Sequence, residues 1–429
     1  MSYDDNLIFV SIAAYRDPQL VPTVLDCIAK ALRPELLRFG VCWQHDADEE
    51  PLLLKDDLRF RIVDVDWRDS KGACWARSEI MKLWQGEDWF LQVDSHCRFA
   101  PGWDEMLLQA MTETSAEKPI LSTYATPFTP GENEVLHGGP LQIVFQAFTP
   151  EGIPQLRPEA FPRTGYAMRP RRARFLSAGF LFAQGCFVQE VTYDPELYFM
   201  GEESAMTVRA FTHGYDLFHP SQTIVWHDYI RADARKHWGD HVDTQRVACH
   251  WKDRDDWSRR KVQRLLLGED VGSFGLGSIR TLADYETYAG LSFKHRKAQQ
   301  YTVRGEEPPN PEAPFDWTDK IYPWIARIRL QRDQLPEGSL NDPQLWNLSI
   351  LDEGGYEICR RDLTTDELAP LYGKQKEIAL IVEFPSESVP ESWTLLPMSR
   401  SLGWLRRIGG KILEDDVAIL KNDEDEVDG

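Results

Sequence analysis

The sequence lacks the features that mark several common classes of protein. Its 429 residues contain no uncharged apolar run of about 18 residues, so we expect no membrane-spanning helix. The seven cysteines are odd in number and widely spaced, and none forms a Cys-x-x-Cys pair, which argues against a disulfide framework and a thiolate zinc site. Acidic residues stand near the N-terminus, where a secretory signal would carry basic ones. We therefore expect a cytoplasmic protein with reduced thiols.

Basic residues are also scarce, because 48 lysines and arginines stand against 69 aspartates and glutamates. The resulting net charge of −21 repels nucleic acids and anionic membranes, so we expect neither as a partner. A negatively charged substrate would need a locally basic pocket or a bound metal ion.

Apolar and aromatic residues, by contrast, are plentiful. Apolar residues make up 42% of the sequence, with 15 Trp, 14 Tyr and 20 Phe, which excludes a disordered chain. A chain of 429 residues is long for one domain, so we expect a large domain accompanied by a smaller one.

Strand-like and helix-like patterns alternate over the first hundred residues. In chain order, these segments are the strand 7–13, the helix 18–30, the strands 37–46 and 59–67, the helix 70–84 and the strand 89–94. Such alternation predicts an α/β fold with a parallel sheet. Ligands bind beyond the carboxyl ends of parallel strands, which is where Tyr15, Asp46 and Asp94 fall.

The rest of the chain divides at a proline-rich stretch. Before it come a predicted helix over 203–213, a predicted strand that carries His227, and a charged region that we interpret as a lid. After it, short β-like runs predict a small β-rich domain. The predicted parts are a large domain over 1–300, a linker over 301–314, a β-rich domain over 315–412 and an acidic tail over 413–429.

The strand 89–94 ends on Asp94, Ser95 and His96, and this end has two interpretations. The polar residues can cap a turn, as an aspartate near a strand end often does. Alternatively, the carboxylate of Asp94 and the imidazole of His96 can converge on one cation, because residues i and i+2 of a strand tail point the same way. Oxygen and nitrogen donors together suit Mn²⁺ well and Mg²⁺ less well.

Four blocks of sequence carry a resemblance to a known family. They are VSIAAYRDPQL (10–20), VDWRDSKGACWARSEI (65–80), HDYIRADARKHW (227–238) and SFGLGSIRTLADYETYAG (273–290). These blocks resemble those of the cytoplasmic hydroxyproline N-acetylglucosaminyltransferase family. More distantly, DSHC with a following Gly-Trp, the Ala-Gly turn and the Gly-Glu-Glu before a helix are similar to the polypeptide GalNAc-transferases. Arg98 departs from those enzymes, which usually carry an acid there.

The resemblance covers residues 7–293 and implies a GT-A-type, Rossmann-like domain that binds a nucleotide sugar. It implies that Asp94 and His96, as a D-x-H motif, together with His227, hold Mn²⁺ or Mg²⁺ against the donor phosphates. It implies as donor-binding residues Tyr15, Arg16, Asp46, Arg77, Ser95, Ala178 and Gly179. Arg77 would support the donor's phosphate or hold Asp94. Asp46 would accept from the uracil N–H.

Glu202 and Glu203 would form the catalytic pair and contact hydroxyls of the sugar and the acceptor. Structural alternatives remain for several of these residues. Arg77 can pair with an acid on its own helix, Tyr15 can pack in the core, and Glu203 can be a favourable charge in the first turn of its helix.

The implied function is a metal-dependent, retaining glycosyltransferase that moves N-acetylglucosamine from UDP-GlcNAc to a hydroxyl. The acceptor would be a polypeptide, at hydroxyproline, Ser or Thr, or a glycan. One alternative is a non-catalytic carbohydrate- or nucleotide-binding protein that uses the β-rich domain for interactions. The intact residues Asp94, His96, His227 and Glu202 argue against it. A metal-dependent hydrolase of nucleotide sugars is a second alternative, and the lack of a carboxylate cluster for a second metal argues against that.

Overall fold

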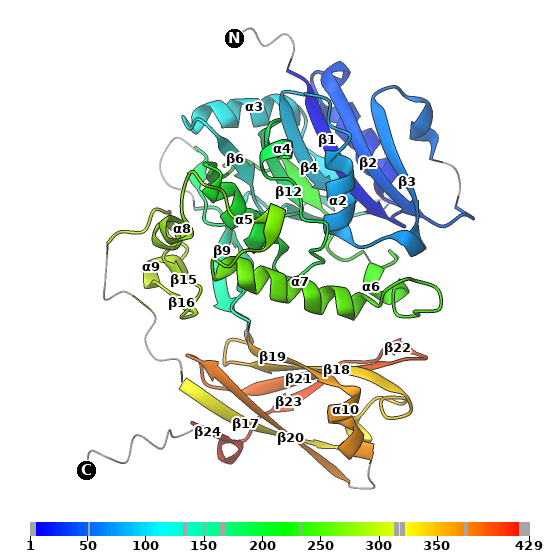
Figure 1. Cartoon of the computed structure of the whole chain (residues 1–429), viewed down its shortest axis with the longest axis vertical. Coiled ribbons are helices and arrows are strands. Elements are labelled where there is room, and N and C mark those ends of the chain that lie inside the picture. Colours follow the sequence, from blue (N-terminus) through cyan, green and yellow to red (C-terminus); the bar gives the residue numbers. More distant parts are fainter. Residues whose placement is uncertain are drawn as a thin grey trace. The chain divides into compact units, whose positions relative to one another are not determined.

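The computed structural model describes residues 6–49, 52–131, 135–136, 138–149, 151–162, 169–231, 234–312, 317, 322–372 and 376–419. The chain divides into two compact units (Figure 1). Unit one comprises residues 1–146 and 153–316, and unit two comprises residues 147–152 and 317–429. The domain boundaries expected from the sequence stay predictions.

Unit one contains both strands and helices, and the two kinds of element are interspersed along the chain. The strands are β1 (Ile8–Tyr15), β2 (Leu37–His45), β3 (Phe60–Asp66), β4 (Trp89–Asp94), β5 (Cys97–Phe99), β6 (Pro119–Ser122), β7 (Thr126–Thr129), β8 (Val135–Leu136), β9 (Leu141–Phe148), β10 (Pro154–Ala160), β11 (Arg171–Arg172), β12 (Phe180–Gln184), β13 (Asp216–His219), β14 (Val225–His227), β15 (Leu291–Ser292) and β16 (Lys297–Ala298). The helices are α1 (Leu20–Lys30), α2 (Ala73–Met81), α3 (Trp103–Glu113), α4 (Phe187–Glu190), α5 (Glu202–Thr212), α6 (His237–Asp240), α7 (Trp251–Leu266), α8 (Leu282–Ala289) and α9 (Gln300–Val303).

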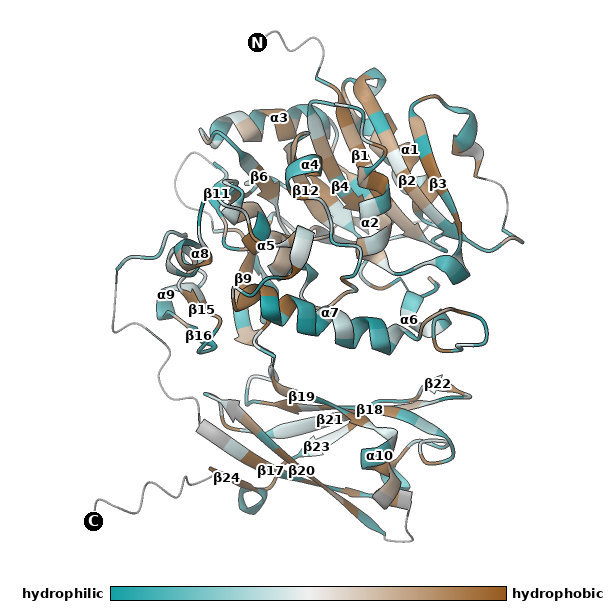
Figure 2. Ribbon diagram, viewed as in Figure 1, coloured by the Kyte–Doolittle hydropathy of each residue, from teal (hydrophilic) through white to brown (hydrophobic). Residues whose placement is uncertain are grey.

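An eight-stranded sheet in the order β11-β13-β6-β12-β4-β1-β2-β3 forms the centre of unit one. β1 pairs in parallel with β2 and β4, and β2 pairs in parallel with β3, whereas β12 is antiparallel to β4 and β6. The strands are mostly hydrophobic (Figure 2), as expected for a sheet buried on both faces. The mixed α/β fold with a central sheet, parallel from β4 through β1 and β2 to β3, confirms the predicted fold class.

A second sheet has four strands in the order β5-β14-β7-β8, and its strand β5 follows β4 in the chain. β14 pairs antiparallel with β5, in a register that sets His227 opposite Cys97. Because Cys97 directly follows His96, this pairing brings two histidines that lie 131 positions apart in the sequence to one place.

Unit two is a β-sandwich in the residues that the structure describes. Its elements are β17 (Tyr322–Gln331), β18 (Pro343–Leu351), β19 (Glu357–Thr364), α10 (Thr365–Leu368), β20 (Glu377–Ser386), β21 (Ser392–Ser399), β22 (Gly403–Trp404), β23 (Ile408–Lys411) and β24 (Val417–Ile419). One sheet contains β20, β17 and β24, and the other contains β19, β18, β21, β22 and β23. Alternate residues of β17 and β18 enter one shared core, among them Ile328 and Leu348, which is the two-residue period of strands with one face buried.

Some of the first residues of the expected acidic tail over 413–429 take part in a strand of unit two. Val417–Ile419 form β24, which pairs with β17, and the adjoining Asp416 is almost fully buried. Arg329 on β17 binds Asp416 through three hydrogen bonds of 2.7 to 3.0 Å, so a buried acid is neutralised by a partner 87 positions away. Residues 420–429 of the predicted tail lie outside the described residues.

The seven cysteines are free thiols, as expected for a chain without a disulfide framework. Among the described residues, every helix is too short or too polar to cross a lipid bilayer.

Candidate functional site

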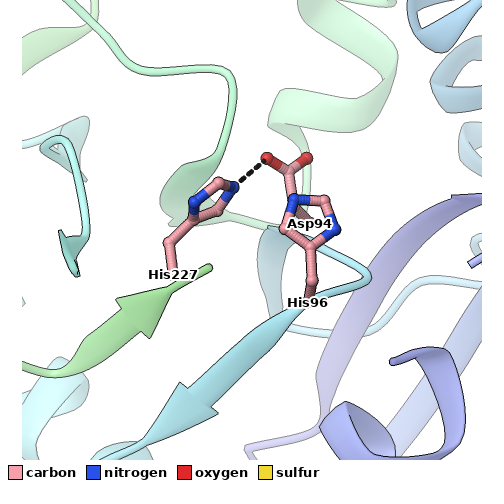
Figure 3. Close-up of side chains that lie close together, drawn as sticks. All are labelled: Asp94, His96 and His227. Atoms are coloured by element: carbon pink, nitrogen blue, oxygen red, sulfur yellow. Dashed lines mark hydrogen bonds and ion pairs between the residues drawn. The ribbon is translucent and has the colours of Figure 1, made fainter. Parts of the chain in front are cut away.

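Three side chains that could hold a metal ion meet at the carboxyl edge of the central sheet. Asp94 ends β4, His96 follows two residues later, and His227 ends β14 (Figure 3). Their candidate ligand atoms all lie within 4.8 Å of one another. His227 Nε2 is 3.1 Å from Asp94 Oδ2, and the ring centroids of His96 and His227 are 4.4 Å apart. The structure thus brings the three predicted metal ligands together. Asp94, His96 and His227 are called the metal group below.

The surroundings of this group fit a divalent cation. One carboxylate and two imidazoles form a donor set that suits Mn²⁺. Nδ1 of His227 is buried and has no hydrogen-bond partner among the described residues. Gly179 lies against the group, because a Cβ at this position would stand 3.0 Å from Asp94 Oδ2. A larger residue there would crowd the carboxylate.

Thr23 on α1 holds the turn that carries Asp94 and His96. The hydroxyl of Thr23, which is fully buried, lies 2.9 Å from the carbonyl oxygen of Ser95. The same hydroxyl accepts a 2.9 Å hydrogen bond from the N–H of Cys97. These contacts hold the backbone on both sides of His96.

Arg77 on α2 connects the metal group to the carboxylate pair at the start of α5. Its guanidinium donates to Asp94 Oδ1 at 2.8 Å and to Glu202 Oε1, and both Arg77 and Glu202 are nearly inaccessible to solvent. Burial alone would raise the pKa of Asp94, but the hydrogen bond from His227 and the charge of Arg77 outweigh it and hold the pKa far below its ordinary value. Asp94 is therefore a carboxylate, as a metal ligand must be.

Glu203, the second member of the carboxylate pair, holds the Ala178–Gly179 turn. One of its oxygens accepts from the N–H of Ala178 at 2.9 Å, and the other accepts from the hydroxyl of Tyr124 at 2.6 Å. Burial raises the pKa of Glu203 to about 7, although both hydrogen bonds act to lower it. The turn beside Asp94 is thus attached to a carboxyl group that changes charge near neutral pH.

The wild-type protein is expected to lose roughly 2–3 kcal/mol more stability than a Glu203→Gln variant between pH 5 and pH 8. The folded pKa of about 7 lies above the ordinary glutamate value, so the folded state binds more protons between them and stability falls as the pH rises through 7. Glutamine imitates the protonated form and removes this dependence. Urea-unfolding midpoints at both pH values measure the effect. The exposed Glu113→Gln is the control, and parallel pH profiles for wild type and Glu203→Gln would contradict the assignment.

Tyr15, Arg16 and Asp46, predicted to bind the nucleoside, lie together at the ends of β1 and β2. The hydroxyl of Tyr15 and the guanidinium of Arg16 both donate to Asp240 Oδ2, at 3.1 and 3.0 Å. Asp46 accepts a 3.0 Å hydrogen bond from the indole of Trp67. Burial raises the pKa of Tyr15 well above its ordinary value, so the hydroxyl keeps its proton as donor.

The segment interpreted as a lid contacts this second cluster. His241, just after α6, is buried and bonds to the carbonyl oxygen of Trp67 through Nε2 at 2.9 Å. His237 stacks on His241 with ring centroids 3.7 Å apart and bonds to the hydroxyl of Tyr198 at 2.8 Å. The helix α6 and the turn after it therefore contact the residues at the ends of β1 and β2. The lid interpretation stays a prediction.

Several residues of the site escape prediction from the sequence. Asp17, Trp67 and Asp240 carry no periodic pattern, and their partners lie far away along the chain. Asp17 stands beside Tyr15 and Arg16 in the loop after β1, so its position at a strand end was a usable signal, but the following Pro18 favoured a plain turn. The remaining predicted donor residue, Ser95, donates to Asp17 Oδ2 at 2.7 Å.

Comparison with known proteins connects this arrangement to a family. A family model described as "Glycosyltransferase (GlcNAc)" matches residues 7–59 and 50–295, which is more than half of the chain. No curated protein matches the sequence.

Solved structures show weaker similarity. A crystal structure of GalNAc-T7 with UDP, GalNAc and Mn²⁺ shares 16% identity, covers 66% of this chain and 55% of that chain, and has a TM-score of 0.43. TarS 1-349 of S. aureus in complex with UDP shares 11% identity over 66% of this chain and 69% of that chain, with a TM-score of 0.38. Its complex with UDP-GlcNAc shares 11% identity over 61% and 72% of the two chains, with a TM-score of 0.36. The chain therefore spans about half the length of GalNAc-T7.

Proposed function

The chain belongs to the glycosyltransferase (GlcNAc) family, and from this premise we propose that it is a metal-dependent transferase that moves N-acetylglucosamine from UDP-GlcNAc to a hydroxyl. The observation that carries the proposal is the meeting of Asp94, His96 and His227 at the carboxyl edge of the sheet. This edge is where ligands bind in sheets of this kind.

Asp94, His96 and His227 would hold Mn²⁺, or Mg²⁺, in this proposal. The cation supplies positive charge that binds the two donor phosphates and offsets the charge of the leaving UDP. This role also explains how a protein with a net charge of −21 binds an anionic donor. The carboxylate of Asp94 is already ionised and held by Arg77, so its negative charge would be available to the cation.

The nucleoside would lie against the cluster at the ends of β1 and β2. Tyr15 and Arg16 would line the uridine, and Asp46 would accept from the uracil N–H. In the structure these groups bond to Asp240 and Trp67. Donor binding would therefore exchange the contacts with Asp240 for contacts with the nucleotide, and Ser95 would face the phosphates beside the metal.

The sugar would lie against the Ala178–Gly179 turn, where the backbone is open because Gly179 has no side chain. Glu203 accepts a hydrogen bond from the N–H of Ala178 and so holds this turn. Glu203 would therefore act on the sugar indirectly, by fixing the turn that contacts it. Glu202 is connected to Asp94 through Arg77, which pairs with both carboxylates. We assign Glu202 to the hydroxyls of the sugar and the acceptor.

The reaction would retain the configuration of the sugar. Both carboxylates of the pair already hold protein groups, which argues against either as an internal nucleophile. In a front-face route, the acceptor oxygen bonds to C1 of the sugar while the bond from C1 to the UDP oxygen breaks. The acceptor proton passes to the departing phosphate. Positioning and charge stabilisation supply much of the barrier reduction for such a site.

The acceptor in this proposal is a polypeptide hydroxyl, on hydroxyproline, Ser or Thr, and the protein acts in the cytoplasm. A carbohydrate- or nucleotide-binding protein without transfer activity is the alternative from another class. It predicts tight UDP-sugar binding without any release of UDP.

A donor screen tests the proposal. UDP-GlcNAc incubated with the protein and Mn²⁺ is expected to release UDP slowly by transfer to water, and chelation by EDTA should abolish the release because the phosphates lose their counter-charge. Other UDP-sugars serve as controls, and candidate hydroxyproline peptides should accelerate the release. Metal-independent release, or binding with no release in the presence of any acceptor, would overturn the transferase assignment.

A further inference from the structure

Asp17 has a buried carboxylate that contacts His96 and has no role in the proposed reaction. It lies in the loop between β1 and α1, and only 1% of its side chain is exposed. Its Oδ2 accepts from the hydroxyl of Ser95 at 2.7 Å and from Arg231 Nη2 at 3.1 Å, and it lies 2.8 Å from His96 Nδ1. Its other oxygen accepts from the N–H of Gln19 at 2.9 Å.

The contact between Asp17 and His96 decides which nitrogen of the imidazole carries the proton. An ionised carboxylate can only accept hydrogen bonds, so Nδ1 of His96 must be the protonated nitrogen and donate. The lone pair then remains on Nε2, which is left to coordinate a metal. A carboxylate behind a ligating imidazole fixes the ring orientation and increases the basicity of the coordinating nitrogen.

Asp17 also joins the separate segments that carry the metal group. Ser95 and His96 belong to the turn between β4 and β5, whereas Arg231 follows β14, the strand that ends at His227. The backbone connects the same two segments, because the N–H of Asp228 donates to the carbonyl oxygen of His96 at 3.0 Å. One carboxylate oxygen thus receives donors from both sides of the group.

We propose that Asp17 is a positioning residue for the metal site: it holds His96 with Nδ1 protonated and Nε2 directed to the cation. This inference rests on the proposed metal-dependent function. A purely structural Asp17 would stabilise the loop and leave metal affinity unchanged, so the two roles predict different measurements.

The test compares the Mn²⁺ affinity of wild type, Asp17→Asn and Asp104→Asn, measured by calorimetry without nucleotide. Asparagine keeps the size of Asp17 and removes its charge, and the affinity is expected to fall by about 10–100-fold, the usual effect of losing such a partner. Asp104 is matched in burial and accepts two backbone N–H hydrogen bonds, from Leu32 and Arg33. Its variant should lose stability and bind Mn²⁺ like wild type.

A second measurement reads the tautomer in the wild-type protein itself, and a variant serves only to assign the signals. Nitrogen NMR of wild-type protein labelled at histidine, with the His96 signals assigned by their loss in His96→Gln, reports the tautomer of His96 in the metal-free state. A proton on Nδ1 supports the inference, and a proton on Nε2 overturns it. Wild-type affinity for Mn²⁺ in a folded Asp17→Asn also overturns it. If wild type itself binds no Mn²⁺, the proposed function fails instead.

Discussion

Replacing Asp94 by Asn is expected to abolish measurable Mn²⁺ binding and to lower the release of UDP from UDP-GlcNAc by about 10²–10³-fold, the scale of losing one charge-stabilising group. Asp94 is the anionic member of the group formed with His96 and His227, and a neutral amide is a much weaker ligand for a divalent cation. The fold should persist, because the buried guanidinium of Arg77 is still paired with the carboxylate of Glu202 in this variant.

The matched control for this variant is Asp64→Asn. Asp64 lies on β3 of the same sheet and pairs with Lys55 and His45 at a half-exposed position away from the metal group. Calorimetry with Mn²⁺ and the UDP-release assay should show wild-type values for it. If Asp94→Asn binds Mn²⁺ as tightly as wild type does, then Asp94, His96 and His227 form a structural network and the metal site is wrong.

Replacing Arg77 by Met is expected to destabilise unit one by about 3–5 kcal/mol, the usual cost of removing one partner from a buried ion pair. Glu202 would be left buried without its counter-charge, and Asp94 would lose a 2.8 Å hydrogen bond. UDP release should also fall, since the metal carboxylate is no longer held. Thermal or urea unfolding measures the first effect, and the release assay measures the second.

A double variant separates the charge of Arg77 from its packing. In Arg77→Met combined with Glu202→Gln, no unpaired acid remains at Glu202, so the combined loss should be smaller than the sum of the single losses by about 1–3 kcal/mol. Lys82→Met provides the control, because Lys82 pairs with Glu79 near the end of the same helix at an exposed position and should cost less than about 1 kcal/mol. Additive single effects would show that Arg77 and Glu202 do not depend on one another.

Much of the fold was predictable because it depends on local patterns. The apolar runs that became β1, β2, β3 and β4 have the length and composition of buried parallel strands, and α1 and α2 lie between them as predicted. Strand ends are predictable for the same reason, which is why the sequence alone identifies Tyr15, Asp46 and Asp94 as candidate site residues. The helix after Gly201 was likewise predicted to within one residue, as α5 begins at Glu202.

The hydrogen bonds and ion pairs of the candidate site could not be predicted from such local patterns. The resemblance implied that Arg77 supports the donor's phosphate or holds Asp94, and an acid on its own helix was the alternative. In the structure Arg77 bonds to Asp94 and also to Glu202, 17 and 125 positions away. Glu203 was weighed as a charge at a helix start, yet it holds the Ala178 turn. Neither contact follows from helical spacing, because each depends on which strands are neighbours in the sheet.

The sequence by itself determined the order of strands and helices along the chain, the residues at the strand ends and the D-x-H motif, since each of these depends on neighbours within a few positions. The tertiary structure alone decided that β14 pairs with β5 and carries His227 to His96, that Asp17 lies behind His96, and that Asp240 reaches Tyr15 and Arg16. The physical reason is that a hydrogen bond acts over about 3 Å, whereas these partners are separated by 79 to 225 positions of chain. Only the pairing and register of the strands bring them within that distance.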